Sequence, residues 1–244
     1  MRPLLAIAGR ELRAYFLSPG GYVVASLFLG ANGLFFARYV FRQGEVASLR
    51  PVFAFSMVVF VLLCPAITMR MISEELRHGT IEMLMTSPVS AAEIILGKFA
   101  AAVGFLVLLV LPTGVFVLAL ELYGRPDYGE LFCGYLGLIL AGSVYLASGI
   151  LASTLTSNQV IAYLVTVFCW ILLLLAVKGL PGSEILPSAS RESLSDLLVA
   201  LDPDLRVRDF AIGLFDSANV VYFSTAVVFL LTASITSLGM RRLR

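Results

Sequence analysis

Side chains that commonly carry out enzyme chemistry are scarce in this sequence of 244 residues. Its one histidine, His78, excludes a metal site of the HExxH type, which needs two histidines on one helical face. Gly97-Lys98 resembles the end of a phosphate-binding Walker A loop, but Ala92 replaces the leading glycine and Phe99 follows the lysine. No serine within an apolar run has a histidine that could activate it. The sequence therefore predicts no catalytic site and no metal site, and if the protein uses ATP, another chain must bind it.

The composition predicts an integral membrane protein. Hydrophobic residues make up 59% of the chain and charged residues 14%, against roughly 25% in soluble domains, and the net charge of +1 gives no indication of nucleic-acid binding. We expect one all-α membrane domain over residues 1–244, with six transmembrane helices at 20–37, 52–69, 99–120, 131–153, 160–177 and 220–238. Small residues in these spans, such as Gly30, Gly33, Gly142 and Gly149, predict close helix packing within or between subunits.

The predicted spans hold few groups that could bind or relay an ion. None has an acidic residue or a lysine near its centre, and Asn32 is the most polar side chain at mid-span. Ion-coupled carriers usually need an ionisable group within the membrane, so this pattern argues against a secondary transporter. Cys64, Cys133 and Cys169 lie in apolar runs, where we expect them to pack as small hydrophobic side chains without disulfides.

The second and third spans are separated by a charged segment, EELRHGTIEMLMTSPVS, residues 74–90. We expect the helix of the second span to continue past the membrane and to end at Gly79, since glycine accepts the left-handed conformation that ends many helices. Thr80 then caps a short helix at 81–86. That helix stops before Pro88, because the residue preceding a proline is pushed out of helical geometry.

The helix that leads into the third span has a recognisable start. Ser90 and Glu93 match a capping box, and Val89 with Ile94 supplies the flanking hydrophobic staple. The whole segment is therefore expected to form a helix, a turn, a short crosswise helix, a second turn and a helix that returns to the membrane.

The short helix at 81–86 is unusually apolar for an exposed segment. Its apolar side chains are Ile81, Met83, Leu84 and Met85, against the single acid Glu82. Methionine suits surfaces that adapt to a partner, and the charged residues Glu74, Glu75 and Arg77 precede the patch. The pattern predicts a docking site with a polar rim. The alternative is an ordinary cytosolic hairpin that lies on lipid headgroups.

Residues 1–19 predict an amphipathic helix in the membrane interface. One face carries Leu4, Leu5, Ala8, Leu12, Tyr15 and Phe16, and the other carries Arg2, Arg10 and Arg13. A cytosolic stub before the first span is the alternative.

Both ends of the chain are expected in the cytoplasm. An even number of spans puts them on one side of the membrane, and each end carries a basic cluster, which favours the cytoplasmic side. The clusters are Arg2, Arg10 and Arg13, and Arg241, Arg242 and Arg244. Residues 178–219 then lie outside, where we expect two short helices, one starting between Ser193 and Asp196 and one over 205–215.

The segment RMISEELRHGTIEMLMTSPVSAAEIILGK resembles the region after the second span of ABC-2 type transporter permeases, where E-E-x-x-x-G-T-x-E-x-L-x-x-x-P-V is typical. The ending DFAIGLFDSANVVYFSTAVVFLLTASITSL is similar to the branch associated with gliding motility and with nitrous-oxide reductase maturation. The resemblance covers nearly the whole chain. It implies the membrane subunit of an ABC transporter in the bacterial inner membrane.

The resemblance also implies partners and site residues. Residues 81–86 would be a coupling helix seated in a cleft of a separate ATP-binding subunit, which would hold the ATP and Mg²⁺. The residues expected to shape that contact are Glu74, Glu75, Arg77, Gly79, Thr80, Ile81, Glu82, Leu84 and Pro88. The helix at 1–19 would be the interface helix, with Arg10 and Glu11 near the same subunit. Such permeases work in pairs, so a second copy or a related permease would complete the pathway, and export is the expected direction.

Two other functions stay open at this point. One is a secondary transporter, which the apolar spans disfavour. The other is a membrane scaffold that anchors an ATPase to motility or assembly machinery without transporting anything. No basic pocket, aromatic cage or acidic ring among the spans identifies a substrate.

Overall fold

The computed structural model describes residues 2–40, 48–79, 90–124, 126–179, 198 and 200–242. All regular secondary structure in these residues is helical, as predicted. The elements are α1 (Arg2–Leu17), α2 (Pro19–Phe35), η1 (Phe36–Val40), α3 (Arg50–Thr68), α4 (Ser73–His78), α6 (Ala91–Val110), η2 (Leu111–Thr113), α7 (Gly114–Tyr123), α8 (Tyr128–Leu155), α9 (Gln159–Gly179), α11 (Pro203–Ala211) and α12 (Ser217–Arg242).

The six predicted spans are confirmed in the described part of the chain as six helices that are long and apolar enough to cross a membrane. They cover Pro19–Val40, Arg50–His78, Ala91–Leu122, Tyr128–Leu155, Gln159–Gly179 and Ser217–Met240. Each predicted span falls inside one of these helices. Hydropathy alone was sufficient to find them, because a membrane-spanning helix satisfies its own backbone hydrogen bonds and needs only enough apolar length.

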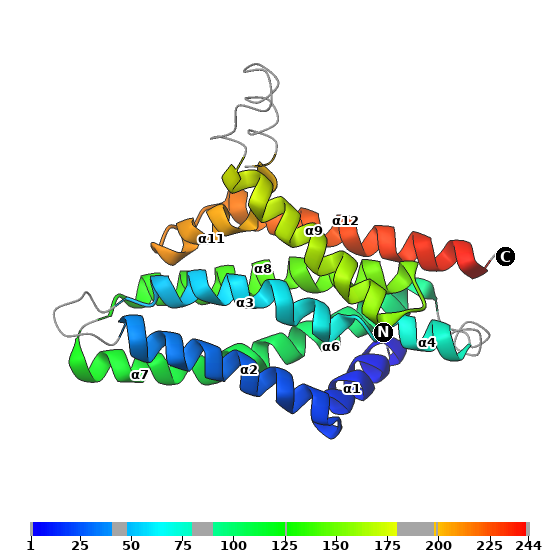
Figure 1. Cartoon of the computed structure of the whole chain (residues 1–244), viewed down its shortest axis with the longest axis horizontal. Coiled ribbons are helices and arrows are strands. Elements are labelled where there is room, and N and C mark those ends of the chain that lie inside the picture. Colours follow the sequence, from blue (N-terminus) through cyan, green and yellow to red (C-terminus); the bar gives the residue numbers. More distant parts are fainter. Residues whose placement is uncertain are drawn as a thin grey trace, which may run out of the picture.

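The helices form an elongated bundle around α8 (Figure 1). α3, α6, α9, α11 and α12 all pack against α8, and α2 packs against α3. The N-terminus, α4 and the C-terminus lie at one end of the bundle, which we call the α4 end, and α7 lies at the other, the α7 end (Figure 1). Both termini therefore lie at the same end of the bundle, as an even number of spans requires.

Small residues on α8 let the neighbouring helices approach closely, which confirms part of the packing prediction. A Cβ at Gly142 would lie 2.5 Å from Leu106 Cδ2 on α6, and a Cβ at Gly134 would lie 2.1 Å from Phe53 Cε2 on α3. Neither space admits a methyl group. By contrast, a Cβ at Gly30 on α2 would meet no atom within 4 Å, so that glycine takes no part in close packing within this chain.

Asn32, the polar residue at mid-span, joins α2 to α3. Its Oδ1 accepts a hydrogen bond of 2.7 Å from Ser56 Oγ, and its Nδ2 donates to the Phe28 carbonyl at 3.0 Å. Both side chains are buried. The amide group therefore serves helix packing, since polar side chains hydrogen-bond across helices where lipid surrounds the bundle.

The predicted unbroken helix from the second span to Gly79 is wrong in one respect, because the chain turns between α3 and α4. α3 ends at Thr68, and α4 begins at Ser73. Ser153 of α8 inserts its hydroxyl here, accepting from the backbone N–H of Ile72 at 3.1 Å and of Ser73 at 2.9 Å. These amides are thereby diverted from the helical i−4 ladder, and such an insertion is a known cause of helix interruption.

Two local predictions around the charged segment are confirmed. Gly79 follows α4 in the left-handed conformation, with φ of 69°. α6 starts with the full capping box, in which Ser90 Oγ accepts from the Glu93 N–H at 3.2 Å and the Glu93 carboxylate accepts from the Ser90 N–H at 2.9 Å. The expected short helix at 81–86 and Val89 of the staple lie outside the described residues.

The short helix predicted at 205–215 is present but shifted toward the N-terminus, as α11. It starts at Pro203 because the Asp202 side chain caps it, accepting from the Asp204 N–H at 2.9 Å. Phe210 on α11 is fully buried, and a Cβ at Gly137 of α8 would lie only 2.7 Å from its Cβ. The helix start expected at 193–196 lies outside the described residues.

Candidate functional site

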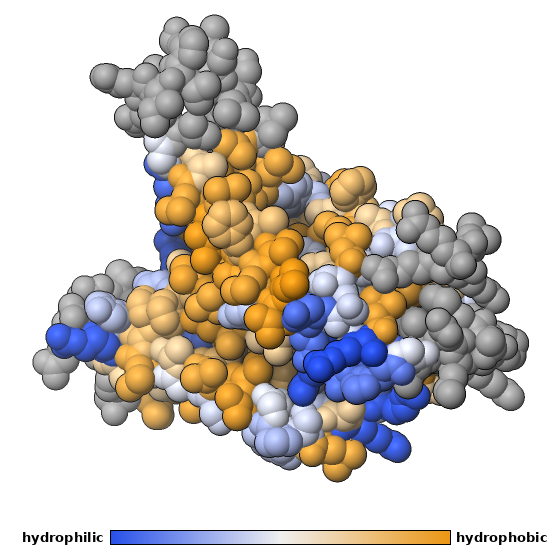
Figure 2. All heavy atoms as spheres, turned by 45° about the vertical axis from the view of Figure 1, so that its right-hand side comes forward, coloured by the Kyte–Doolittle hydropathy of each residue, from blue (hydrophilic) through white to orange (hydrophobic). Residues whose placement is uncertain are grey.

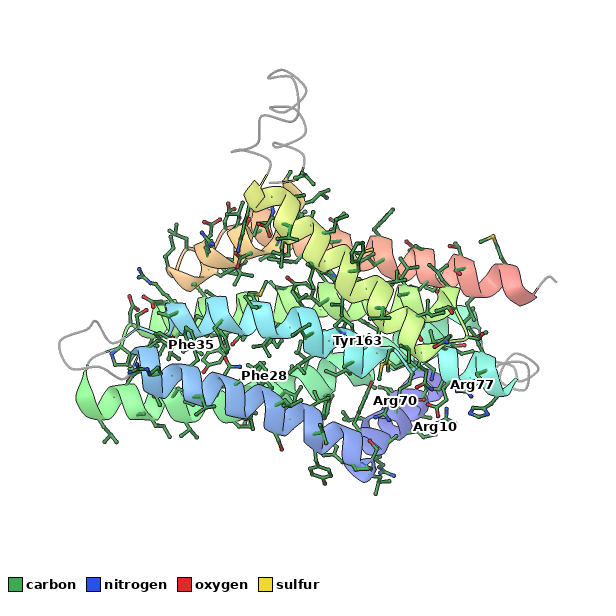
Figure 3. All side chains as sticks on the ribbon, in the orientation of Figure 1. Arg10, Phe28, Phe35, Arg70, Arg77 and Tyr163 are labelled. Atoms are coloured by element: carbon green, nitrogen blue, oxygen red, sulfur yellow. The ribbon has the colours of Figure 1, made fainter. Side chains whose placement is uncertain are left out.

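A cavity of about 250 Å³ lies at the α4 end of the bundle, between α1, the turn after α3, α4 and the start of α6. Its charged lining residues are Glu11, Arg70, Glu74, Glu75 and Lys98. Figure 2 brings this end forward and shows hydrophilic residues gathered there beside a largely apolar surface. Arg10, Arg70 and Arg77 are all at the same end (Figure 3).

A buried lysine lies at the centre of this site. Lys98 Nζ is 3.0 Å from Glu11 Oε1 and 2.9 Å from Glu75 Oε1. The lysine side chain is only 2% exposed, and the two glutamates are 19% and 16% exposed. A buried charge is costly unless it is paired and hydrogen-bonded, and here two carboxylates meet that requirement. The cluster ties together α6, which carries the lysine, α1 and α4.

α1 reaches the lysine because α6 has a glycine at the contact. A Cβ at Gly97 would lie 3.0 Å from Ile7 Cγ2 and 3.1 Å from the Leu4 carbonyl oxygen, so only a glycine leaves α1 its present position. The approach at Gly97 brings α1 against α6 next to Lys98, where Glu11 can reach the ammonium group.

Tyr15 fixes α1 against the neighbouring helices. Its hydroxyl donates a hydrogen bond of 3.0 Å to the Ile67 carbonyl of α3, and its ring stacks on Phe105 of α6 with 4.6 Å between centroids. Burial, with a smaller contribution from the nearby Glu11 carboxylate, raises the pKa of Tyr15 above its ordinary range. The phenol therefore stays protonated and keeps donating.

Arg70, in the turn after α3, contacts the junction of α1 and α2. Its Nη2 lies 3.3 Å from Ser18 Oγ, and the same nitrogen would be 3.0 Å from a Cβ at Gly20. Ser18 is the residue that separates α1 from α2. The end of the second span thus contacts the point where the N-terminal helix turns into the first span.

The structure brings together some of the residues predicted to act at this end. Glu11 and Glu75 meet at Lys98, whereas Glu74, Arg77 and Gly79 are exposed on or after α4. Arg10 is 63% exposed and lies 3.4 Å from Glu11. The other predicted residues, Thr80, Ile81, Glu82, Leu84 and Pro88, lie outside the described residues.

Three residues of the site escaped sequence reasoning: Lys98, Tyr15 and Ser153. Lys98 had a signal, because it is a lysine within the apolar helix Ala91–Leu122, and ionisable residues in such helices are usually paired. Tyr15 and Ser153 had none, since a tyrosine in an amphipathic helix and a serine near a span end are ordinary.

A second charged contact lies at the α7 end. Arg50 Nη2 is 2.7 Å from Glu130 Oε2, and Ser48 Oγ donates to the same carboxylate. This contact joins the starts of α3 and α8, and the Arg50 side chain is 51% exposed. Unlike the Lys98 cluster, it involves none of the predicted site residues.

The arrangement at the α4 end is suited to holding α1, α4 and α6 in register. The buried Lys98 is paired with the partly buried Glu11 and Glu75. Within the described residues, no three metal-ligating side chains gather closely enough to hold a metal ion. What the cluster can do is transmit displacement between α1, α4 and α6.

Comparison with known families bears on this interpretation. The model of a family described as ABC-2 family transporter protein matches residues 34–194, more than half of the chain. The chain belongs to this family. Membership makes it an ABC transporter membrane subunit, and the match includes α3, α4, α6 and the Lys98 position. A search of curated proteins found no match for this ABC-2 chain.

Proposed function

We propose that this ABC-2 chain is the permease subunit of an ABC exporter of the bacterial cytoplasmic membrane, driven by a separate ATPase subunit. The observation that supports this most directly is the Lys98 cluster. It ties α1 and α4 to the third span at the end of the bundle where residues 80–89 connect α4 to α6. These are the elements that an ATPase would have to move.

The α4 end is proposed to face the cytoplasm. Both chain termini lie at this end (Figure 1), and the predicted basic clusters are in the terminal segments. α1 would then lie along the cytoplasmic surface as the interface helix, with Arg10 and Arg13 exposed on it. An ATPase in the cytoplasm would meet α1, α4 and residues 80–89 together.

The proposed mechanism is a shift between inward- and outward-facing states. ATP and Mg²⁺ would bind to the partner ATPase, and its closure would displace residues 81–86, where a coupling helix is expected. The ATPase can shift the permease only if its contacts with the permease are more favourable in one of the two states than in the other. Glu74, Arg77 and Gly79 on or after α4, with Arg10 on α1, would be part of that contact.

A pair of permeases is proposed to enclose the pathway. In one copy, α9 exposes large apolar side chains along its length, including Leu164, Phe168, Leu172 and Leu175. In a membrane such a face contacts either lipid or a second copy of the chain. Native mass spectrometry of the purified complex measures the number of permeases directly, and two per complex is the expected result.

The experiment that tests the proposed function is co-purification with the ATP-binding protein encoded nearest to this chain. Wild type is compared with a variant in which residues 80–87 are replaced by a Gly/Ser linker. We expect wild type to retain the ATPase and the variant to lose it, because the linker removes the apolar helix that would seat in the ATPase cleft.

A matched control carries a Gly/Ser linker at residues 41–47, which connect η1 to α3 at the α7 end. This control should retain the ATPase. Equal retention by all three proteins would show that residues 80–87 do not dock, and retention by none would contradict the transporter assignment.

Transport itself is tested separately from docking. Inverted vesicles that contain the complex should accumulate the exported compound with ATP, whereas a scaffold would hydrolyse ATP without moving any cargo. The family match ends at residue 194, so the resemblance of the C-terminal segment to the gliding-motility and nitrous-oxide reductase branch stays a prediction.

A further inference from the structure

The Lys98 cluster joins two helices that pack on different parts of the bundle. α1 packs against α6 and α2, whereas α4 packs against α8 and α9. Lys98 Nζ nevertheless contacts a carboxylate from each, Glu11 of α1 at 3.0 Å and Glu75 of α4 at 2.9 Å. The lysine thus links α1, which packs directly on α6, to α4, which packs mainly on α8 and α9.

We propose that Lys98 is a positioning residue that makes α1 and α4 move as one unit when the ATPase acts on this end of the permease. The inference rests on the proposed function, because it requires a driving subunit. Lys98 would hold the two helices together through its ion pairs with Glu11 of α1 and Glu75 of α4.

Burial is the physical reason for the strength of this bridge. The Lys98 side chain is 2% exposed, so salt and water screen its two ion pairs much less than surface pairs. Separating α1 from α4 would take one of the two carboxylates away from the buried ammonium group of Lys98, which is unfavourable because a buried charge depends on its paired groups. The nearby Arg10–Glu11 pair, with Arg10 63% exposed, contributes far less.

The position of Lys98 also determines which transmembrane spans a movement of α1 and α4 acts on. The lysine belongs to α6, so a movement of the α1–α4 unit acts directly on the third span. α4 is at the same time connected to the second span through the turn after α3, and to α8 through Ser153. Three spans are therefore reached from one end of the bundle.

The test is a distance measurement between α1 and α4 in the complete complex with the ATPase. Spin labels are placed at Gly9→Cys and His78→Cys, both exposed positions, after Cys64, Cys133 and Cys169 are replaced by alanine. Double electron–electron resonance is recorded without nucleotide and with a non-hydrolysable ATP analogue. The ATPase rate of each unlabelled complex is measured in parallel.

We expect the label distance to be the same with and without the analogue when Lys98 is present. In Lys98→Met, the distance should change or broaden on analogue binding, and the stimulation of the ATPase by the permease should fall by about fivefold or more. Lys98→Arg, which keeps a cation between the two carboxylates, should restore most of the stimulation.

A second variant guards against misfolding. Lys98→Met leaves two partly buried carboxylates without the lysine cation, so it is combined with Glu11→Gln and Glu75→Gln, which remove those charges at nearly constant volume. This triple variant should behave like Lys98→Met. Arg208→Met, which removes a 61%-exposed cation paired with Asp204 outside the cluster, should leave distance and stimulation unchanged.

Two results overturn the inference alone: a wild-type distance that changes with the analogue, or a triple variant that keeps both a constant distance and full stimulation. A wild-type chain that recruits no ATPase overturns the proposed function, and the inference with it. Co-purification of the unlabelled wild type separates these cases before any Lys98 variant is made.

Discussion

The hydroxyl of Ser153, near the C-terminal end of α8, accepts a hydrogen bond of 2.9 Å from the backbone N–H of Ser73, the first residue of α4. The same hydroxyl donates to the Met69 carbonyl at 3.1 Å. Ile72, at the N-cap position of α4, makes no capping hydrogen bond of its own. A side chain from another helix thus satisfies backbone groups that the break after α3 would leave unpaired.

The first prediction concerns the hydrogen bonds that the Ser153 hydroxyl accepts from the start of α4. Ser153→Ala should destabilise the protein by about 0.5–2 kcal/mol, the usual cost of losing a helix cap, because the amides of the buried residues Ile72 and Ser73 both donate to the Ser153 hydroxyl. The midpoint of thermal unfolding in detergent measures the loss, and hydrogen exchange at the start of α4 should accelerate.

Ser143→Ala is the matched control for Ser153. Ser143 lies on the same helix, but its hydroxyl donates only to the Ile139 carbonyl of α8 itself. Its removal should leave the unfolding midpoint and the exchange of α4 nearly unchanged. Equal effects of the two substitutions would show that Ser153 is not a cap for α4.

The second prediction concerns Gly79, whose φ of 69° disfavours residues with a Cβ. Gly79→Val should introduce about 1–2 kcal/mol of backbone strain, whereas Gly79→Asn should be tolerated, since asparagine visits this conformation more readily. A Cβ here would meet no atom within 4 Å, so crowding does not contribute. ATPase stimulation and thermal stability should both rank glycine first, asparagine second and valine last. A valine variant equal to wild type in both would contradict the proposal that Gly79 sets the direction of the chain.

The third prediction concerns packing between α3 and α8. Gly134→Ala should destabilise the bundle by about 1–3 kcal/mol, because the added methyl group overlaps the buried ring of Phe53. Gly33→Ala on α2 is the control, since its Cβ would meet no atom within 4 Å. The control should be neutral or slightly stabilising, by about 0.4–1 kcal/mol. The midpoints of thermal unfolding of both variants test this prediction. A Gly134→Ala variant as stable as wild type would mean that α3 and α8 move apart at little cost to accommodate the methyl group.

The fourth prediction concerns the buried contact between Asn32 and Ser56. A double-mutant cycle with Asn32→Ala and Ser56→Ala should give a coupling energy of about 0.6 kcal/mol, typical of hydrogen bonds between membrane helices. The equivalent cycle of Asn32→Ala with Ser143→Ala should give no coupling, because those residues share no hydrogen bond. Additive effects of Asn32 and Ser56 would show that their contact does not hold α2 on α3.

Local features of this protein could be predicted from the sequence. The spans follow from apolar length, the capping box from Ser90 and Glu93, and the left-handed turn from Gly79 at the end of a charged helix. Each depends on residues within a few positions of one another. The short helix expected at 205–215 starts earlier, at Pro203, because the Asp202 side chain caps it there.

Contacts between distant residues could not be predicted in the same way. Lys98 and Glu11 are 87 positions apart, and Ser153 lies 80 positions from Ser73. The break between α3 and α4 depends on the second of these pairs, which is why an unbroken helix was the natural expectation. Nothing near Met69 in the sequence indicates that a hydroxyl from α8 will insert there.

The sequence by itself determined that the chain is a six-span helical membrane protein with a charged segment after the second span. It could do so because a helix in a bilayer satisfies its own backbone and needs only local apolar length. The tertiary structure alone decided that α1, α4 and α6 meet at Lys98, because a buried lysine requires carboxylates that only the packing of separate helices can bring within hydrogen-bonding distance.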